Sequence, residues 1–238
     1  MEIIREIIIN IIVALITYII TRAYQGYKNF KGIKHAARFN ADCFKAGIVN
    51  VFPTRKTYGE HKEHGTSSEY ISQAEHSVLY VGYWLASGTE MGNLKETIKI
   101  LTEDKKTVSL VFINPYNENS LLTCADYIGI SSPAIKSRVK AVIKDLLDFK
   151  KQLGENSRYL IIKIHEVPLS ASAFIIDDTS KKNCRILVDY KIYKKSREES
   201  YGIEFQDANK IVTKRMLDSY KIIATEAREI KDISEIHK

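Results

Sequence analysis

The sequence is poor in proline and cysteine, and these shortages exclude several classes of protein. Only 4 of the 238 residues are proline, so long proline-rich disordered tracts are absent. The three cysteines (Cys43, Cys124 and Cys184) are odd in number and form no Cys-x-x-Cys pair. This pattern argues against both a disulfide framework and a zinc site. We expect the cysteines to be small buried residues in a reducing compartment.

Familiar motifs for catalysis and nucleotide binding are missing as well. The sequence has no Gly-x-Gly-x-x-Gly fingerprint, no Walker loop and no Gly-x-Ser-x-Gly elbow. His61 and His64 have a spacing that could bind a metal ion, with Glu60 and Glu63 beside them. The whole stretch is polar and differs from the His-Glu-x-x-His helix motif, so a solvated loop is the simpler interpretation. We therefore predict no metal site and no cofactor.

One apolar run dominates the amino terminus. Residues 7–21 (IIINIIVALITYIIT) contain no charge, whereas a membrane-spanning helix needs roughly 20 residues. Arg5 and Arg22 can snorkel and lengthen the span, and Tyr18 and Tyr24 suit the membrane interface. A cleaved signal peptide is disfavoured because a positive charge follows the run directly. A buried or interfacial helix would show a polar face, which is missing. We expect residues 1–25 to form one transmembrane helix.

The residues after this run are basic and set the expected orientation. Six basic residues in 22–45 stand against a single acidic one, Asp42. By the positive-inside rule the C-terminal part lies in the cytosol, so the chain is a single-pass protein of the cell (inner) membrane. Residues 26–47 form a basic juxtamembrane connector, partly helical and closed by Gly47, whose cations can lie on anionic headgroups. Asn10 indicates either a homo-oligomer through the membrane or one tolerated polar residue.

The overall charge allows more than one kind of partner. Basic residues outnumber acidic ones by 36 to 29. An excess of this sign suits nucleic acid, anionic lipid or a phosphate-bearing ligand. Part of this basic excess has a simpler explanation, because cations beside a membrane helix act as a topology signal.

The remainder of the chain alternates between strand and helix patterns. Short β-branched or aromatic runs are separated by stretches with apolar residues three and four apart. Strands are expected at 48–52, 78–85, 107–113, 159–165, 172–176, 184–190 and 201–205, and helices from the Thr66–Glu69 capping box, over 91–101, from Ser132-Pro133 to Gly154 and over 209–230. We predict one α/β domain over 48–238: a mostly parallel sheet with flanking helices and an antiparallel C-terminal extension.

The segment that follows the fourth strand carries a family resemblance. His165 ends that strand, and Asp177-Asp178 ends the next one. The order of elements from Gly47 through the strand at Gly82 to Asn114-Pro115 contributes to the same resemblance. Over residues 48–206 the chain resembles the phospholipase D superfamily. Its members carry His-x-Lys-x4-Asp, in which the histidine attacks a phosphodiester phosphorus and the lysine holds the phosphate oxygens.

The departures from that pattern bear on the expected activity. Counted from His165, Val167 stands where the family has lysine, and Ser172 stands where it has aspartate. One such half is present, so a complete site would need a dimer. The resemblance implies a degenerate member that lacks the motif and binds its ligand without cutting it. Related degenerate domains occur as sensory or effector modules in bacterial regulators and anti-phage systems.

The candidate site residues share one property, which is their position at or near the end of a predicted strand. The carboxyl ends of parallel strands are where α/β proteins bind ligands. The candidates for ligand binding are Arg55, Tyr83, Trp84, Asn114, His165, Ser170 and Ser172. His165 is also the candidate for catalysis. Simpler roles compete: Trp84 as a core residue, His165 bonded to backbone, and the serines as turn residues.

Three functions remain open on the sequence alone. The leading one is a membrane-anchored cytosolic sensor or effector that binds a phosphate-bearing ligand, such as a nucleotide, or a protein partner. The second is a phosphodiesterase or nuclease assembled as a dimer around His165. The third is a membrane scaffold without a small ligand. The missing lysine favours the non-enzymatic functions.

Overall fold

The computed structural model describes residues 22, 25–28, 30–32, 34–54, 57, 60, 65–85, 89–195 and 199–237. The chain forms two compact units, residues 1–45 and 46–238. The described residues of the first unit are helical. Gly47 follows that helix with φ 87°, the left-handed conformation that suits glycine at a helix end.

No helix within those ranges has the length and the apolar character that crossing a membrane requires. The transmembrane helix predicted for residues 1–25 lies almost entirely outside the described residues. It stays a prediction.

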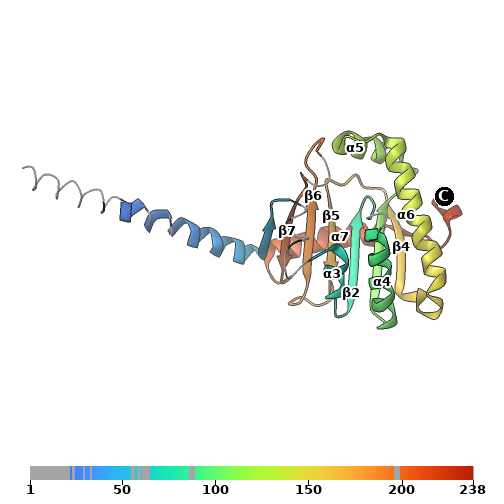
Figure 1. Cartoon of the computed structure of the whole chain (residues 1–238), viewed down its shortest axis with the longest axis horizontal. Helices are drawn as coiled ribbons and strands as arrows, with labels where there is room; N and C mark the ends of the chain where they lie inside the picture. Colours follow the sequence, from blue (N-terminus) through green and yellow to red (C-terminus); the bar gives the residue numbers. More distant parts are fainter. Residues whose placement is uncertain are drawn as a thin grey trace, which may run out of the picture. The chain divides into compact units, whose positions relative to one another are not determined.

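The described strands of the second unit form a single mixed sheet (Figure 1). Its order is β1-β7-β6-β5-β2-β3-β4-β8. The strands are β1 (Ile48–Phe52), β2 (Ser77–Gly82), β3 (Thr107–Ile113), β4 (Leu160–His165), β5 (Ala171–Ile176), β6 (Arg185–Tyr190), β7 (Tyr201–Gln206) and β8 (Arg228–Glu229).

The prediction of a mostly parallel sheet is wrong. Only the β2–β3 and β3–β4 pairs are parallel, and the five other pairs are antiparallel. The predicted antiparallel extension does exist as β5, β6 and β7, but it lies between β2 and β1 and so occupies the interior of the sheet. The hydrophobic pattern marks each strand and carries no information on which strand becomes its neighbour.

The helices cover both faces of this sheet. They are α3 (Ser67–Ser72), α4 (Thr89–Glu103), α5 (Glu118–Ile128), α6 (Ser132–Gln152) and α7 (Ile211–Glu226), with 3-10 helices η1 (Gly154–Tyr159) and η3 (Ile233–His237). The predicted capping box at α3 is confirmed, with Thr66 and Glu69 bonded reciprocally. Helix α5 was not predicted, although Asn117 caps its start and Gly129 ends it in the left-handed conformation.

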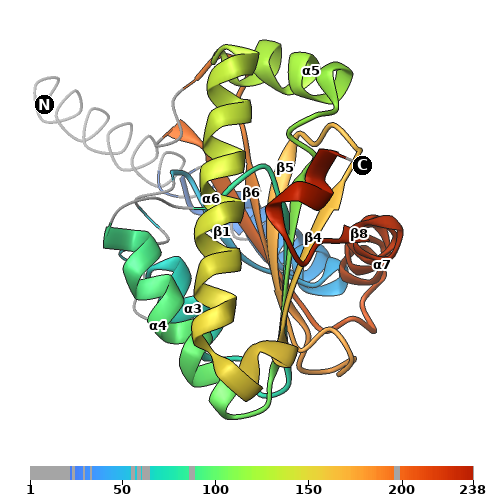
Figure 2. The same cartoon turned by 90° about the vertical axis from the view of Figure 1, so that its right-hand side faces the viewer.

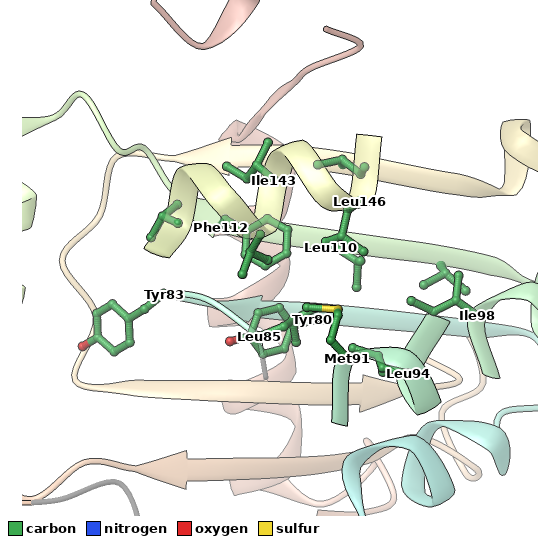
Figure 3. Packing of buried hydrophobic residues seen from close by; sticks show 14 of the residues in the cluster. Tyr80, Tyr83, Leu85, Met91, Leu94, Ile98, Leu110, Phe112, Ile143 and Leu146 are labelled. Atoms are coloured by element: carbon green, nitrogen blue, oxygen red, sulfur yellow. The ribbon is translucent and has the colours of Figure 1, made fainter. Parts of the chain in front are cut away.

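Two hydrophobic cores sandwich the sheet. Helices α3, α4 and α6 lie over one face and α7 over the other (Figure 2). Figure 3 shows the first core, where Met91 and Leu94 of α4 lie near Tyr80 of β2 and Leu110 of β3. Val111 of β3 points to the second core. The central strands are buried on both faces, which explains their nearly continuous apolar sequences.

A buried ion pair fixes the outer strands. The Glu204 carboxylate of β7 accepts hydrogen bonds from Arg185 Nε of β6 at 2.8 Å and from Asn50 Nδ2 of β1 at 2.7 Å. Arg185 also donates from Nη1 to Gln73 Oε1 at 2.5 Å and lies over the Tyr70 ring. Because burial of an unpaired carboxylate would be costly, these contacts hold β1 and α3 in place.

The turn after β5 reaches back to the start of β2. Asp177 has φ 56° and is buried. Its Oδ1 accepts backbone N–H bonds from Glu75 at 3.0 Å, His76 at 2.7 Å and Ser77 at 3.2 Å. A carboxylate that receives several backbone donors is a strong local anchor. Asp177 therefore fixes the antiparallel β2–β5 pair at one end.

We expect Asp177→Asn to lower the free energy of unfolding by about 2–3 kcal/mol, because the neutral amide weakens three charge-assisted hydrogen bonds. Asparagine tolerates the same backbone conformation, so the loss reports on the hydrogen bonds. The measurement is urea unfolding of the full chain. Asp104→Asn, at a carboxylate whose side chain is 56% exposed, is the control and should change stability by less than about 0.5 kcal/mol. Equal effects of both variants would contradict the anchoring role.

Candidate functional site

The candidate residues converge on one edge of the sheet. Strands β2, β3 and β4 end at this edge and the antiparallel β5 begins there. Trp84, Asn114, His165, Ser170 and Ser172 consequently come from neighbouring strands in the order β5-β2-β3-β4. We call this region the β2–β5 edge. Arg55 was also predicted to belong to it and lies outside the described residues.

His165 is buried beneath this edge, with an exposed fraction of 2%. Its Nε2 lies 3.2 Å from the Gly82 carbonyl oxygen, and its Nδ1 accepts the Val167 N–H at 3.2 Å. Because a carbonyl can only accept, Nε2 carries the proton and the ring is neutral. Burial lowers the pKa of His165 from 6.5 to about 4, although the Gly82 hydrogen bond opposes this shift.

This arrangement leaves His165 no free lone pair with which to attack phosphorus. Nδ1 is occupied by a backbone N–H, and Nε2 is occupied by its own proton. The geometry therefore supports the backbone-bonded role that competed with catalysis. His165 ties the end of β4 to the end of β2.

Tyr83 lies in the core and does not line the edge. It is 2% exposed, and its hydroxyl lies next to the thiol of Cys124 in α5. Burial raises the pKa of Tyr83 well above its ordinary value, and burial likewise raises the pKa of the Cys124 thiol. Both groups stay protonated and pack the loop after β2 against α5.

Trp84, the next residue, is half-buried and remains accessible. The guanidinium carbon of Arg138 in α6 lies 5.8 Å from the centroid of a Trp84 ring, within cation–π range. The Tyr80 hydroxyl donates to the Trp84 carbonyl at 2.8 Å, which fixes the backbone of this loop. Trp84 is thus partly a core residue, as the simpler interpretation held, and partly a surface residue of the edge.

The Asn114 side chain is hydrogen-bonded to the loop after β4. Its Nδ2 donates to Glu166 Oε1 at 2.8 Å, and its Oδ1 accepts the Tyr116 N–H at 2.9 Å. Asn117 Nδ2 donates to the other Glu166 oxygen at 2.6 Å. The Glu166 carboxylate therefore accepts a hydrogen bond from each of the two asparagines. These bonds join the loop after β3 to the end of β4.

The two serines differ in exposure. Ser170 is exposed, whereas Ser172 is 8% exposed and lies next to Gly82 of β2. A Cβ added at Gly82 would stand 2.8 Å from the Ser172 Cβ and closer still to the Tyr80 hydroxyl. Glycine is therefore required at position 82 for β5 to approach β2 here.

Three residues of this region were missed from the sequence. Asp189 lies directly opposite Ser172 in the β5–β6 register, and Lys191 Nζ contacts Asp189 Oδ2 at 2.5 Å. Lys191 Nζ also lies 3.4 Å from Ser200 Oγ. The side chains of Asp189 and Lys191 are only 13% and 14% exposed. A signal was available, because strand alternation places Asp189 on the same face as the apolar Leu187.

The spacing of the family motif occurs in β5. Counted from Ser170, the pattern Ser-x-Ser-x4-Asp ends on Asp177, which is the spacing of His-x-Lys-x4-Asp. The first two positions carry serine, and the third keeps aspartate with its bonds to the start of β2. Counting back from Asp177, and not forward from His165, would have found this alignment in the sequence.

Metal binding finds no support within the described part of the chain. No group of three or more His, Cys, Asp or Glu residues that could hold an ion occurs there. His61 and His64 lie outside the described residues.

The burial of His165 predicts a pH dependence of stability. The pKa of His165 in the folded chain is about 4, below the ordinary 6.5. Between these two pH values the unfolded chain binds a proton at this histidine and the folded chain does not. Stability is therefore lost as pH falls from 6.5 towards 4. Between pH 7 and pH 5 the loss should be about 2 kcal/mol.

His165→Gln removes this titration and should flatten the pH profile of urea unfolding, although the variant starts from a lower stability. His76→Asn, at an exposed histidine, is the matched control and should keep the full slope. A profile as steep in His165→Gln as in the unmodified chain would exclude a buried neutral His165.

Comparisons with known proteins extend to solved structures only. No protein-family model matches the chain, and no curated protein matches it. The chain is similar to phosphatidylserine synthase of Haemophilus influenzae Rd KW20, with 13% identity and a TM-score of 0.49 over 71% of this chain. It spans 38% of the synthase. It is also similar to a phospholipase D family member, Nuc from Salmonella typhimurium, with 11% identity and a TM-score of 0.41 over 69% of this chain and 88% of Nuc.

Proposed function

We propose that the chain is a membrane-anchored sensor or effector whose phospholipase D-like domain binds a phosphate-bearing ligand at the β2–β5 edge and does not cut it. The domain is residues 48–238, with the cytosol as its compartment. Homo-oligomerisation through the membrane helix, with Asn10 at the helix contact, is part of the proposal. So is a role in regulation or anti-phage defence, which rests on the resemblance alone.

The observation that carries the proposal is the chemistry that β5 and β6 bring to this edge. Ser170 and Ser172 occupy the positions that the motif spacing assigns to the nucleophile and to the phosphate-holding lysine. The two serine hydroxyls remain at these positions. Asp189 of β6 lies opposite Ser172, and the Lys191 ammonium is bonded to Asp189. Hydroxyl and ammonium groups are good donors to phosphate oxygens.

The same residues argue against turnover. Serine hydroxyls need an adjacent base to become nucleophiles, and His165 is neutral with both ring nitrogens engaged by backbone groups. Binding needs only the donors, whereas hydrolysis needs an activated nucleophile as well. The phosphodiesterase alternative therefore lacks its central group in this arrangement.

The test is thermal unfolding of the full chain in detergent with inorganic phosphate, nucleotides, cyclic nucleotides and a generic phosphodiester, with turnover assayed in parallel. A ligand at 100 times its Kd stabilises by about 2.7 kcal/mol, which should raise the Tm by about 5–10 °C in a chain of this size. We expect such a shift without turnover.

Two variants locate the ligand. Ser172→Ala and Lys191→Gln should each lose the shift, because each removes a donor to the phosphate. Lys182→Gln, an exposed lysine in the turn between β5 and β6, lies at the opposite edge and should keep it. Turnover that disappears in His165→Ala would make the protein an enzyme. No shift with any compound would leave the scaffold function.

A further inference from the structure

A basic and aromatic surface adjoins the β2–β5 edge. It consists of the first half of α6 together with Trp84 and Tyr116, and we call it the α6 surface. Lys136 Nζ and Lys140 Nζ lie 4.8 and 5.2 Å from the centroid of the Tyr116 ring. Arg138 lies over Trp84. Two half-buried aromatic rings at neighbouring strand ends thus each carry cations from the same helix.

The charge of this surface is not neutralised by the described part of the protein. Residues 132–144 of α6 contain Lys136, Arg138, Lys140 and Lys144 and no acidic residue. No ion pair between these four cations and a described carboxylate is present. Lys136 and Lys140 are one turn apart and repel each other.

This concentration of charge is local. Residues 46–238 carry 29 basic and 26 acidic residues, so the domain as a whole is close to neutral. Four unneutralised cations on less than four turns of one helix therefore stand out against their surroundings. An anion bound here would relieve the repulsion between them.

The arrangement around the helix favours an extended ligand. Helical geometry puts Lys136 and Lys140 on one flank of α6, Arg138 on the other, and Lys144 towards the exposed side. A ligand that contacts both aromatic rings therefore meets cations from both flanks of the helix. A flexible chain of phosphates can contact cations on both flanks and both rings at once.

We propose that the α6 surface binds single-stranded nucleic acid, with the lysines and Arg138 holding phosphates and with Trp84 and Tyr116 contacting bases. Alternating cations and aromatic rings are the usual means of binding single strands without sequence preference. The inference rests on the proposed function and narrows it, because it names the class of phosphate-bearing ligand.

An anionic membrane would also be attracted to these cations, but the aromatic side chains fit it less well. Anchoring in the membrane interface requires rings that protrude, and Trp84 and Tyr116 are half-buried with cations over them. The bases of a mobile strand can approach such rings individually. The observations therefore favour nucleic acid over lipid.

The experiment is fluorescence anisotropy of a labelled 20-nucleotide oligothymidylate and the matching oligouridylate with the full chain in zwitterionic nanodiscs. We expect binding whose logarithm falls linearly with the logarithm of salt concentration. In Lys136→Gln/Lys140→Gln the affinity should fall by at least about tenfold and the salt slope by about 1.4, since each phosphate contact on a single strand contributes about 0.7.

Lys181→Gln/Lys182→Gln is the matched control, because it removes the same charge from exposed positions at the opposite edge. It should change neither affinity nor slope. Tyr116→Leu tests the aromatic contact separately and should weaken binding by about tenfold while leaving the salt slope unchanged. Equal losses in the α6 variant and the control would overturn the proposal.

Other ligands give distinguishable results. Equal affinity for a duplex of the same length, or binding to anionic vesicles without binding to the oligonucleotides, would overturn the inference. A thermal shift with nucleotides but no oligonucleotide binding would do so as well, and would leave the proposed function standing. If the chain shows neither a thermal shift nor oligonucleotide binding, both the proposed function and this inference are wrong.

Discussion

The structure depends on the antiparallel pairing of β5 with β2. This pair joins the parallel β2-β3-β4 half of the sheet to the antiparallel half. It is held at one end by the Asp177 carboxylate on the backbone at the start of β2, and at the other by the close approach of Ser172 to Gly82. Because register is fixed at both ends, every side chain of β5 has a defined face. The site at the β2–β5 edge follows from that register.

Local features of the fold could be predicted because local interactions determine them. The strand at Thr107–Ile113 and the helix from Ser132 have the predicted starts, since an apolar run and a Ser-Pro start depend on few neighbours. The strand order could not be predicted in this way. The position of β5 beside β2 is decided by long-range contacts such as those of Asp177, and the predicted parallel sheet was wrong for that reason.

The edge itself was predictable, because the ends of parallel strands gather at one side of a sheet. The roles of its residues were not. Tyr83 and Trp84 are neighbours in sequence, yet one is in the core and the other reaches the surface. Asn114 is bound by Glu166, which only the folded loops bring together. The β5–β6 register places Lys191 at the edge. The sequence alone therefore did not single it out as a site residue.

The net charge illustrates the same limit in physical terms. The chain has 36 basic and 29 acidic residues, but residues 1–45 account for most of this excess, with 7 basic against 3 acidic residues. What a ligand meets on the domain is a local potential, which depends on which cations lie near carboxylates. Lys191 beside Asp189 is neutralised, whereas the cations of α6 lie over aromatic rings. An arriving anion would therefore be attracted first to α6 and only then compete for Lys191.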